Sequence, residues 1–218
     1  MKKQFTALFA MLTIAIFSTA FAGGHNAEKL LMEVQIPEKT IELPEGYVPT
    51  VMITGANRGI GFEFVKVYLA RDYNVIATAR SPGKADALNA LAAENENLTV
   101  VQLDVTDFPR VDALAAELQG QPIDILINNA GISGDVRGQM FGNIDYDEFS
   151  KVLDVNVIAP TKIAESFYQN LLDSQLKKLV VVSSSEGSIA GISSPRTMVY
   201  RTSKAAVNMM YTNLAVQL

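Results

Sequence analysis

The chain has 218 residues, of which 49% are hydrophobic and 19% are charged, and its formal net charge at pH 7 is −5. This length suits one α/β domain with a sizeable core but is short for two full domains. The basic residues are scattered, so the sequence predicts no nucleic-acid partner. It has no cysteine, so disulfides, thiolate catalysis and cysteine-based zinc sites are excluded, and with His25 as its one histidine no metal site is expected.

The first 22 residues have the three parts of a secretory signal peptide. Lys2 and Lys3 form a basic start, residues 5–17 are mainly apolar, and an A-x-A site ends at Ala22. We therefore expect residues 1–22 to be removed and the protein to be exported, to a periplasm or the medium. The alternatives are a cytoplasmic protein or a membrane anchor, for which the run is short because a full span needs ~20 apolar residues. With the signal cleaved, no stable membrane span is expected.

Residues 23–48 are polar, contain Pro37 and Pro44, and show no sustained period. This composition is typical of a linker or an N-terminal arm. From residue 49 onward, short apolar runs alternate with amphipathic segments. We therefore expect one domain over 49–218.

Strand patterns alternate with helix patterns through this domain. The first strand, TVMIT, is short and rich in β-branched residues, as buried parallel strands are. Strands are expected at 50–54, 74–79, 98–103, 123–128 and 178–184, and helices at 59–71, 84–93, 110–118, 146–172 and from Tyr200 onward. A strand followed by a helix, repeated five times, predicts an α/β fold with a doubly wound parallel sheet, the Rossmann fold.

A glycine-rich segment, TGANRGIG, separates the first strand from the first helix. Its glycines let the turn close tightly and let the backbone approach a pyrophosphate, whose charge is favoured at the start of a helix. The position after a strand and before a helix predicts dinucleotide binding, whereas the alternative is a plain tight turn. The residues expected to contact the cofactor here are Gly55, Asn57, Arg58, Gly59, Ile60 and Gly61.

The choice of cofactor depends on the end of the second strand. NAD sites usually carry an acidic residue there for the ribose hydroxyl, whereas a 2′-phosphate needs a cation. This strand ends in ATAR, so Arg80 and Arg58 of the glycine turn can converge on one phosphate. NADP(H) is therefore favoured over NAD. The alternative at each position is a solvated surface arginine.

Two further strand ends supply candidate cofactor contacts. Asp104 and Val105 follow the third strand, where a carboxylate can bind an adenine amino group, although an Asx-turn or helix cap explains Asp104 equally well. Asn129, Ala130 and Gly131 follow the fourth strand, and their small size permits close packing against a cofactor. A structural turn is the alternative for these three.

Tyr200 and Lys204 form the sharpest chemical signal in the chain. Their i,i+4 spacing places both side chains on one helix face, where the ammonium can stabilise a phenolate. A phenol supported in this way can act as a general acid or base. The pair follows the fifth strand and the serines 183–185, at the sheet edge where ligands of such folds bind.

With these motifs in order, the sequence resembles the short-chain dehydrogenase/reductase family over residues 50–218. TGANRGIG matches the family's TGxxxGxG turn, and NNAG, DVNV, SSSEG and YRTSK match its later signatures. The ATAR, EGSIAG and YRTSKAAVN segments look most like the sniffer and C-factor-like carbonyl reductases.

The resemblance implies an oxidoreductase that transfers hydride between NADP(H) and a small carbonyl or alcohol substrate, with carbonyl reduction favoured. It implies that Tyr200 exchanges a proton with the substrate oxygen and that Lys204 supports Tyr200 and holds the nicotinamide ribose. Ser184 would bind the substrate carbonyl, with Ser183 and Ser185 as alternatives. Asn156 would support a water relay, with a satisfied helix asparagine as the alternative. Family members are often oligomers, so a homo-oligomer is possible.

Two departures from the family pattern affect these expectations. The loop between Ser184 and Tyr200 is longer than the commonest spacing, which predicts an inserted turn near the substrate. The final helix pattern stops at Leu218, before the family's next strand, Pro-Gly turn and substrate-covering segment, so we expect a domain truncated at the C-terminus. An NADP(H)-binding sensor or inactive protein without turnover is therefore the alternative function. Nucleotide-sugar epimerases or dehydratases are disfavoured because they tend to use TGxxGxxG.

Overall fold

The computed structural model describes residues 41–194 and 196–217. The predicted signal peptide at 1–22, and the part of the predicted arm before residue 41, lie outside this range. Contacts gather Gly46–Leu218 into one compact unit. Within the part of the chain that is described, no helix is both long and apolar enough to cross a membrane.

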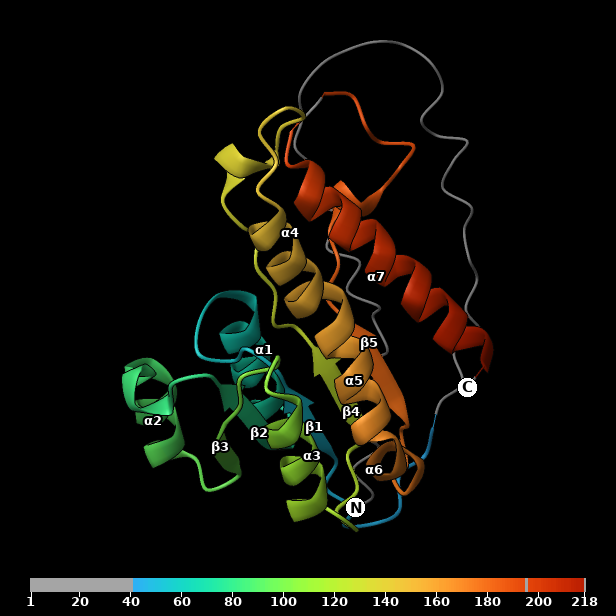
Figure 1. Cartoon of the computed structure of the whole chain (residues 1–218). Helices are drawn as coiled ribbons and strands as arrows, with labels where there is room; N and C mark the ends of the chain where they lie inside the picture. Colours follow the sequence, from blue (N-terminus) through green and yellow to red (C-terminus); the bar gives the residue numbers. More distant parts are fainter. Residues whose placement is uncertain (1–40, 195, 218) are drawn as a thin grey trace, which may run out of the picture. The chain divides into compact units, whose positions relative to one another are not determined.

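Five short parallel strands form the sheet, in the order β3-β2-β1-β4-β5 (Figure 1). The strands are β1 (Thr50–Ile53), β2 (Asn74–Ala79), β3 (Leu98–Gln102), β4 (Ile125–Asn128) and β5 (Lys178–Val181). Because β1 pairs with both β2 and β4, the winding of the chain reverses between β1 and β4. This order confirms the predicted doubly wound fold, whose ligands bind at the carboxyl ends of the strands beside that reversal.

Within residues 41–194 and 196–217, seven α-helices connect and flank the strands. They are α1 (Gly59–Leu69), α2 (Asp86–Glu94), α3 (Phe108–Glu117), α4 (Tyr146–Leu153), α5 (Ala159–Ser166), α6 (Tyr168–Leu172) and α7 (Met198–Gln217). Short 3₁₀ turns occur at η2 (Pro82–Lys84), η3 (Val136–Gln139) and η5 (Ser185–Gly187). Helix α7 packs beside α4, and α3 packs beside α5 (Figure 1).

The long helix predicted over 146–172 is broken, so that prediction is wrong in detail. Between α4 and α5 the chain forms one π turn, η4 (Asp154–Ile158), and a second break falls at Phe167. Pro160 has no N–H to continue the α-helical ladder, and the hydrogen-bond pattern shifts in the turn before it. The π turn carries Asn156, which is buried.

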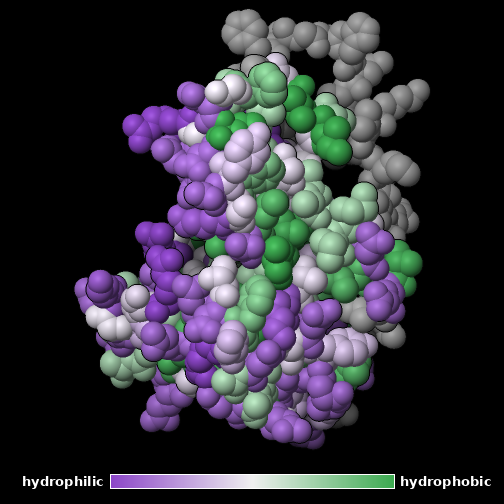
Figure 2. All heavy atoms as spheres, in the orientation of Figure 1, coloured by the Kyte–Doolittle hydropathy of each residue, from purple (hydrophilic) through white to green (hydrophobic). Residues whose placement is uncertain are grey.

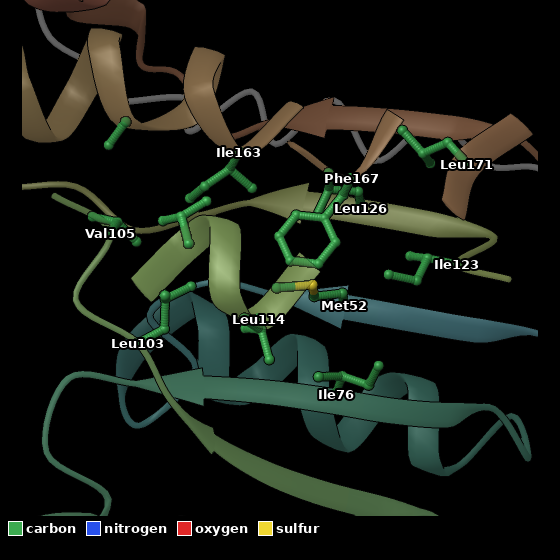
Figure 3. Close-up of a cluster of buried hydrophobic side chains, with 12 residues drawn as sticks. Met52, Ile76, Leu103, Val105, Leu114, Ile123, Leu126, Ile163, Phe167 and Leu171 are labelled. Atoms are coloured by element: carbon green, nitrogen blue, oxygen red, sulfur yellow. The ribbon is translucent and has the colours of Figure 1, made fainter. Parts of the chain in front are cut away.

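The core lies between the sheet and helices α3 and α5. Met52 and Leu126 of the central strands meet Leu114, Ile163 and Phe167 from the helical layer (Figure 3). Strands β1 and β4 are buried along their whole length, because helices cover both faces of the sheet. Burial of each such large apolar side chain contributes about 1.5–3 kcal/mol to the free energy of folding. The core therefore fixes the central strands whose ends carry the candidate site.

A buried carboxylate ties the opposite edge of the sheet together. Asp124, just before β4, accepts hydrogen bonds from the Tyr47 hydroxyl at 2.8 Å and the Thr50 N–H at 2.8 Å. It also accepts the N–H groups of Gln175 and Leu176, each at 3.1 Å. The chain segments leading into β1, β4 and β5 are thus joined at one side chain. Tyr47, which the sequence placed in the arm, takes part in this junction.

Candidate active site

The glycine turn after β1 closes on itself too tightly for side chains. Gly55 and Gly59 have φ angles of +64° and +56°, which favour glycine. A Cβ on Gly61 would lie 2.4 Å from the Gly55 carbonyl oxygen and 2.5 Å from the Asn129 amide nitrogen. By contrast, nothing lies within 4 Å of a Cβ on Gly59. The turn is therefore packed on its inner side and open at Gly59.

Helix α1 begins at this turn and presents an anion-binding end. Its N-cap, Arg58, makes no side-chain capping bond, and the first N–H groups of a helix have no intrahelical partner. Arg58 and Arg80 are exposed, and among the described residues neither guanidinium pairs with a carboxylate. Asn57 is half-buried, and Ile60 is 51% exposed. This end of α1 fits a dinucleotide that carries an additional phosphate. It offers free backbone amides, two guanidinium groups without a carboxylate partner in the described chain, and one exposed apolar side chain.

The NNAG segment holds the glycine turn in place. The Thr54 hydroxyl accepts the N–H groups of Asn129 and Ala130 at 3.0 and 3.1 Å. The Asn129 amide donates in turn to the carbonyls of Thr54 and Gly55, at 2.9 and 3.1 Å. These contacts give Asn129 and Ala130 the structural role that the sequence left open.

The end of β3 carries the Asx-turn that was the alternative for Asp104. Its Oδ1 accepts the N–H of Thr106 at 3.1 Å and the Thr106 hydroxyl at 2.8 Å. The side chain of Val105 belongs to the hydrophobic core cluster. These contacts show local structural roles, and cofactor contact by either residue stays a prediction.

Lys204 is buried where the NNAG segment meets α7. It is 6% exposed, its ammonium donates to the Val182 carbonyl at 2.9 Å, and it lies 5.8 Å from the centre of the Tyr200 ring. Burial lowers the pKa of Lys204 from its usual value. A Cβ on Gly131 would lie 3.6 Å from the same ammonium nitrogen. The fold thus brings Gly131, Lys204 and Tyr200 together, and the catalytic and cofactor-binding roles of these residues stay predictions.

Asn156 supports this cluster from the π turn. Its Oδ1 accepts the Ile132 N–H at 2.9 Å, and its amide donates to the Ile132 carbonyl at 2.8 Å and to the Ser203 hydroxyl at 2.9 Å. Ser203 donates to the Tyr200 carbonyl at 2.7 Å. Asn156 therefore reaches the Tyr200 backbone through one hydroxyl, as a satisfied helix asparagine does. Its water relay stays a prediction.

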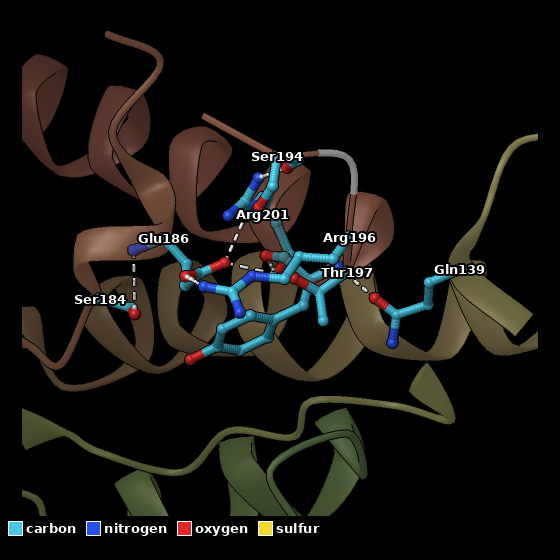
Figure 4. Close-up of polar contacts among 9 residues, drawn as sticks. Gln139, Ser184, Glu186, Ser194, Arg196, Thr197 and Arg201 are labelled. Atoms are coloured by element: carbon cyan, nitrogen blue, oxygen red, sulfur yellow. Dashed lines mark hydrogen bonds and ion pairs between the residues drawn. The ribbon is translucent and has the colours of Figure 1, made fainter. Parts of the chain in front are cut away.

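The serines after β5 differ in how their hydroxyl groups are used. Ser183 donates to the Asn208 side-chain oxygen at 2.6 Å, on α7. Ser184 instead accepts the Glu186 N–H at 3.2 Å, an arrangement in which its own proton remains available for another acceptor (Figure 4). Ser185 is exposed. This pattern favours Ser184 over Ser183 as a hydroxyl group that could donate to a substrate, and Ser185 stays an alternative.

Three polar residues beside Tyr200 were missed by the sequence analysis. Glu186 pairs with Arg201 across η5 and α7, with 2.5 Å between Oε2 and Nε, and the buried Gln139 accepts the Tyr200 N–H at 3.0 Å (Figure 4). Arg201 lowers the pKa of the Glu186 carboxyl by a hydrogen bond. The only sequence signal was that Glu186 and Arg201 lie inside SSSEG and YRTSK. Nothing in the sequence around Gln139 marked it.

A groove of about 580 Å³ runs along α7 beside the loop that precedes it. Figure 2 shows apolar surface in this part of the molecule, where Ile189 and Ile192 are exposed. At 3.6 residues per turn, the α7 residues of the groove point away from Tyr200 and Lys204. The groove therefore lies on the side of α7 opposite Tyr200 and Lys204. Its α7 residues are Met198, Arg201, Thr202, Ala205 and Ala206.

Comparisons with known proteins agree with this geometry. The short chain dehydrogenase family model matches residues 49–218. A short chain dehydrogenase of Penicillium aethiopicum is 35% identical over 176 residues, covering 77% of this chain and 69% of that protein. Human retinol dehydrogenase 8 is 34% identical over 175 residues, covering 78% of this chain and 54% of that protein.

Solved structures show the same relationship. The carbonyl reductase Sniffer of Drosophila melanogaster has a TM-score of 0.73 and 27% identity, covering 79% of this chain and 76% of that chain. An NADPH-bound carbonyl reductase from chicken fatty liver has a TM-score of 0.68 and 37% identity, covering 75% and 71%. A carbonyl reductase from Pseudomonas aeruginosa in complex with NADP has a TM-score of 0.71 and 30% identity, covering 78% and 77%. The chain therefore belongs to the short-chain dehydrogenase/reductase family, as its ordered motifs predicted.

Proposed function

We propose that this protein is an NADP(H)-dependent oxidoreductase that reduces a small carbonyl compound to an alcohol. The observation that carries the proposal is the buried Lys204 ammonium, which lies beside Tyr200 on one side and Gly131 on the other. The NADP-bound and carbonyl reductase titles among the solved structures support the same chemistry.

The residues of the glycine turn would hold the cofactor. Arg58 and Arg80 would bind the 2′-phosphate, and the first amides of α1 would bind the pyrophosphate. Gly131 and Lys204 would border the nicotinamide ribose. When bound, NADPH supplies the hydride.

The protein's own residues would handle the proton. The Tyr200 hydroxyl donates its proton to the substrate oxygen, and the Lys204 ammonium favours the phenolate that remains. The Ser184 hydroxyl donates a hydrogen bond to the same substrate oxygen and so stabilises the negative charge that develops there. Asn156, acting through Ser203, holds the Tyr200 backbone.

The test is NADPH oxidation by the purified chain against a panel of aldehydes and ketones. We expect Tyr200→Phe to lower turnover by about 10²–10⁴-fold while NADPH affinity, measured by calorimetry, is kept. Ser184→Ala should lower turnover far more than its neighbour control, Ser183→Ala. Binding of NADPH without turnover by the wild type would indicate the non-catalytic alternative, and absence of NADPH binding would contradict both.

We also propose export of the protein, on the basis of the signal-like sequence at residues 1–22. The mature protein recovered from outside the cytoplasm should then begin at Gly23 by mass spectrometry. A chain that retains Met1 in the cytoplasmic fraction would refute this.

A further inference from the structure

Gln139 makes two hydrogen bonds from a fully buried position in η3. Its side-chain oxygen accepts the Tyr200 N–H at 3.0 Å (Figure 4). Its amide donates to the Ser133 carbonyl at 2.6 Å. It thereby links the loop after NNAG to the helix that carries Tyr200, although 61 residues separate the partners.

The start of α7 needs a partner of this kind. Tyr200 is the third residue of α7, so its N–H is one of the first-turn groups without an intrahelical acceptor. Thr197, just before the helix, has a φ of +48°, and its hydroxyl donates to Glu186. That hydroxyl is therefore engaged elsewhere, and Gln139 performs the capping role for Tyr200.

The surroundings of Gln139 hold its amide in one place. Gly134 has a φ of +72°, and a Cβ there would lie 2.8 Å from a Val152 methyl group and 3.1 Å from the Gln139 amide nitrogen. Val152 is itself fully buried. In so close a packing the Gln139 side chain has little room for another rotamer.

The Tyr200 backbone is therefore held at both of its polar groups. Gln139 holds the N–H, and Ser203, bonded to Asn156, holds the carbonyl. Gln139 and Asn156 both bond to the segment directly after Gly131, through Ser133 and Ile132 respectively. We propose that Gln139 is a positioning residue that sets the Tyr200 phenol relative to ligands bound at Gly131. This inference rests on the proposed function.

Two substitutions test the proposal. Q139M keeps the length of the side chain but removes both hydrogen bonds, and we expect kcat to fall by about tenfold or more while the Kd for NADPH changes less than twofold. In Q139E the protonated carboxyl can replace both bonds, whereas the carboxylate cannot donate to Ser133. The ratio of Q139E to wild-type kcat should therefore rise as the pH falls, while the same ratio for Q139M stays level. Q119M, at an exposed glutamine after α3, is the matched control and should leave kcat unchanged.

Two results would overturn the proposal. One is a kcat for folded Q139M within twofold of the wild type. The other is a pH-independent Q139E ratio with parallel losses of kcat and NADPH affinity, which indicates a merely structural role. If Q139M does not fold, Q139E at low pH decides the question.

A separate measurement distinguishes failure of this inference from failure of the proposed function. If the wild type reduces no carbonyl compound, the proposed function is contradicted. The role of Gln139 is then tested by amide hydrogen exchange, which does not depend on enzyme activity. Exchange at the Tyr200 amide should then be about tenfold faster in Q139M, or in Q139E above its carboxyl pKa, than in the wild type. Unchanged exchange would overturn the positioning role.

Discussion

The Arg201 guanidinium lies 2.5 Å from the Glu186 carboxylate and ties α7 to the turn after β5. The same guanidinium donates to the Ser194 carbonyl at 2.6 Å, and its side chain is only 11% exposed. One arginine thus fastens the long loop before Tyr200 to the helix. This contact lies in the loop for which the sequence predicted an inserted turn, and that insertion stays a prediction.

Arg201→Met should release that loop, because it leaves the Glu186 carboxylate without its nearest cation. We expect a loss of about 1–2 kcal/mol in the free energy of unfolding, measured in urea, and faster proteolysis within 188–197. Arg196→Met is the control, since Arg196 is 66% exposed and 3.7 Å from Glu186. Equal effects of the two substitutions would contradict the assignment.

The stability that this ion pair contributes should decrease at acid pH. Arg201, followed by Thr197 and Arg196, holds the pKa of Glu186 below its usual value. A carboxyl with a lowered folded pKa contributes stability that is complete above its unfolded pKa, about 4.3, and is lost as the pH falls through the folded pKa. The stability difference between wild type and Arg201→Met should therefore be constant near neutrality and shrink below about pH 4. A difference that grows toward acid pH would be inconsistent with this pair.

Arg80→Ala should change cofactor preference, because it removes one of two exposed guanidinium groups beside the glycine turn. We expect the Kd for NADPH to rise by about 10–100-fold while the Kd for NADH changes little. Calorimetric titration with both cofactors measures this. Arg71→Ala, at another exposed arginine in the same unit, is the control. Equal losses of affinity for NADPH and for NADH would argue against phosphate recognition at Arg80.

Gly61→Ala should damage the glycine turn, since its Cβ would meet the Gly55 carbonyl oxygen at 2.4 Å. Backbone cannot rotate away as a side chain can, so we expect about 1–3 kcal/mol of destabilisation and weaker NADPH binding. Gly83→Ala is the control, because nothing lies within 4 Å of that Cβ. Thermal unfolding and NADPH titration of both variants separate the clash from a general effect of removing glycine.

The strands were predictable because each forms a short apolar run, and in β1 and β4 that run is buried along its whole length. Each of the five apolar runs forms a strand, and only the ends of the strands differ from the prediction. The strand β4 starts at Ile125 rather than at residue 123, because the Asp124 just before it bonds to neighbouring chain segments. Short motifs likewise marked Tyr200, Lys204 and Gly131, which lie near one another in the structure, although their roles stay predictions. In both cases the information lies in the local sequence.

Contacts between loops could not be predicted in this way. Gln139 and Glu186 have no period around them, and their partners are set by how α7 docks, 61 and 15 residues farther along the chain. The break in the helix at Asn156 was hidden for a similar reason. Its apolar pattern continues through the π turn, so only Pro160 marked the change of hydrogen bonding.

At the opposite edge of the sheet, the Tyr47 hydroxyl donates to the buried Asp124 carboxylate at 2.8 Å. Tyr47→Phe should cost about 1.5 kcal/mol in the free energy of unfolding, because the carboxylate loses a donor while its backbone partners remain. Tyr146→Phe is the control, since Tyr146 is 72% exposed. Equal stabilities of Tyr47→Phe and wild type at neutral pH would contradict the junction.

The same hydrogen bond predicts that the stability of the protein changes with pH in the alkaline range. Burial, followed by the hydrogen bond to Asp124, raises the pKa of Tyr47 to about 12. A phenol whose folded pKa exceeds its unfolded value of about 10 contributes stability that is complete below that value and is lost as the pH rises toward the folded pKa. The stability advantage of the wild type over Tyr47→Phe should therefore be constant to about pH 9 and decline between about 10 and 12. Urea unfolding across this range measures it, and an advantage that increases with pH would show that Asp124 does not hold the neutral phenol.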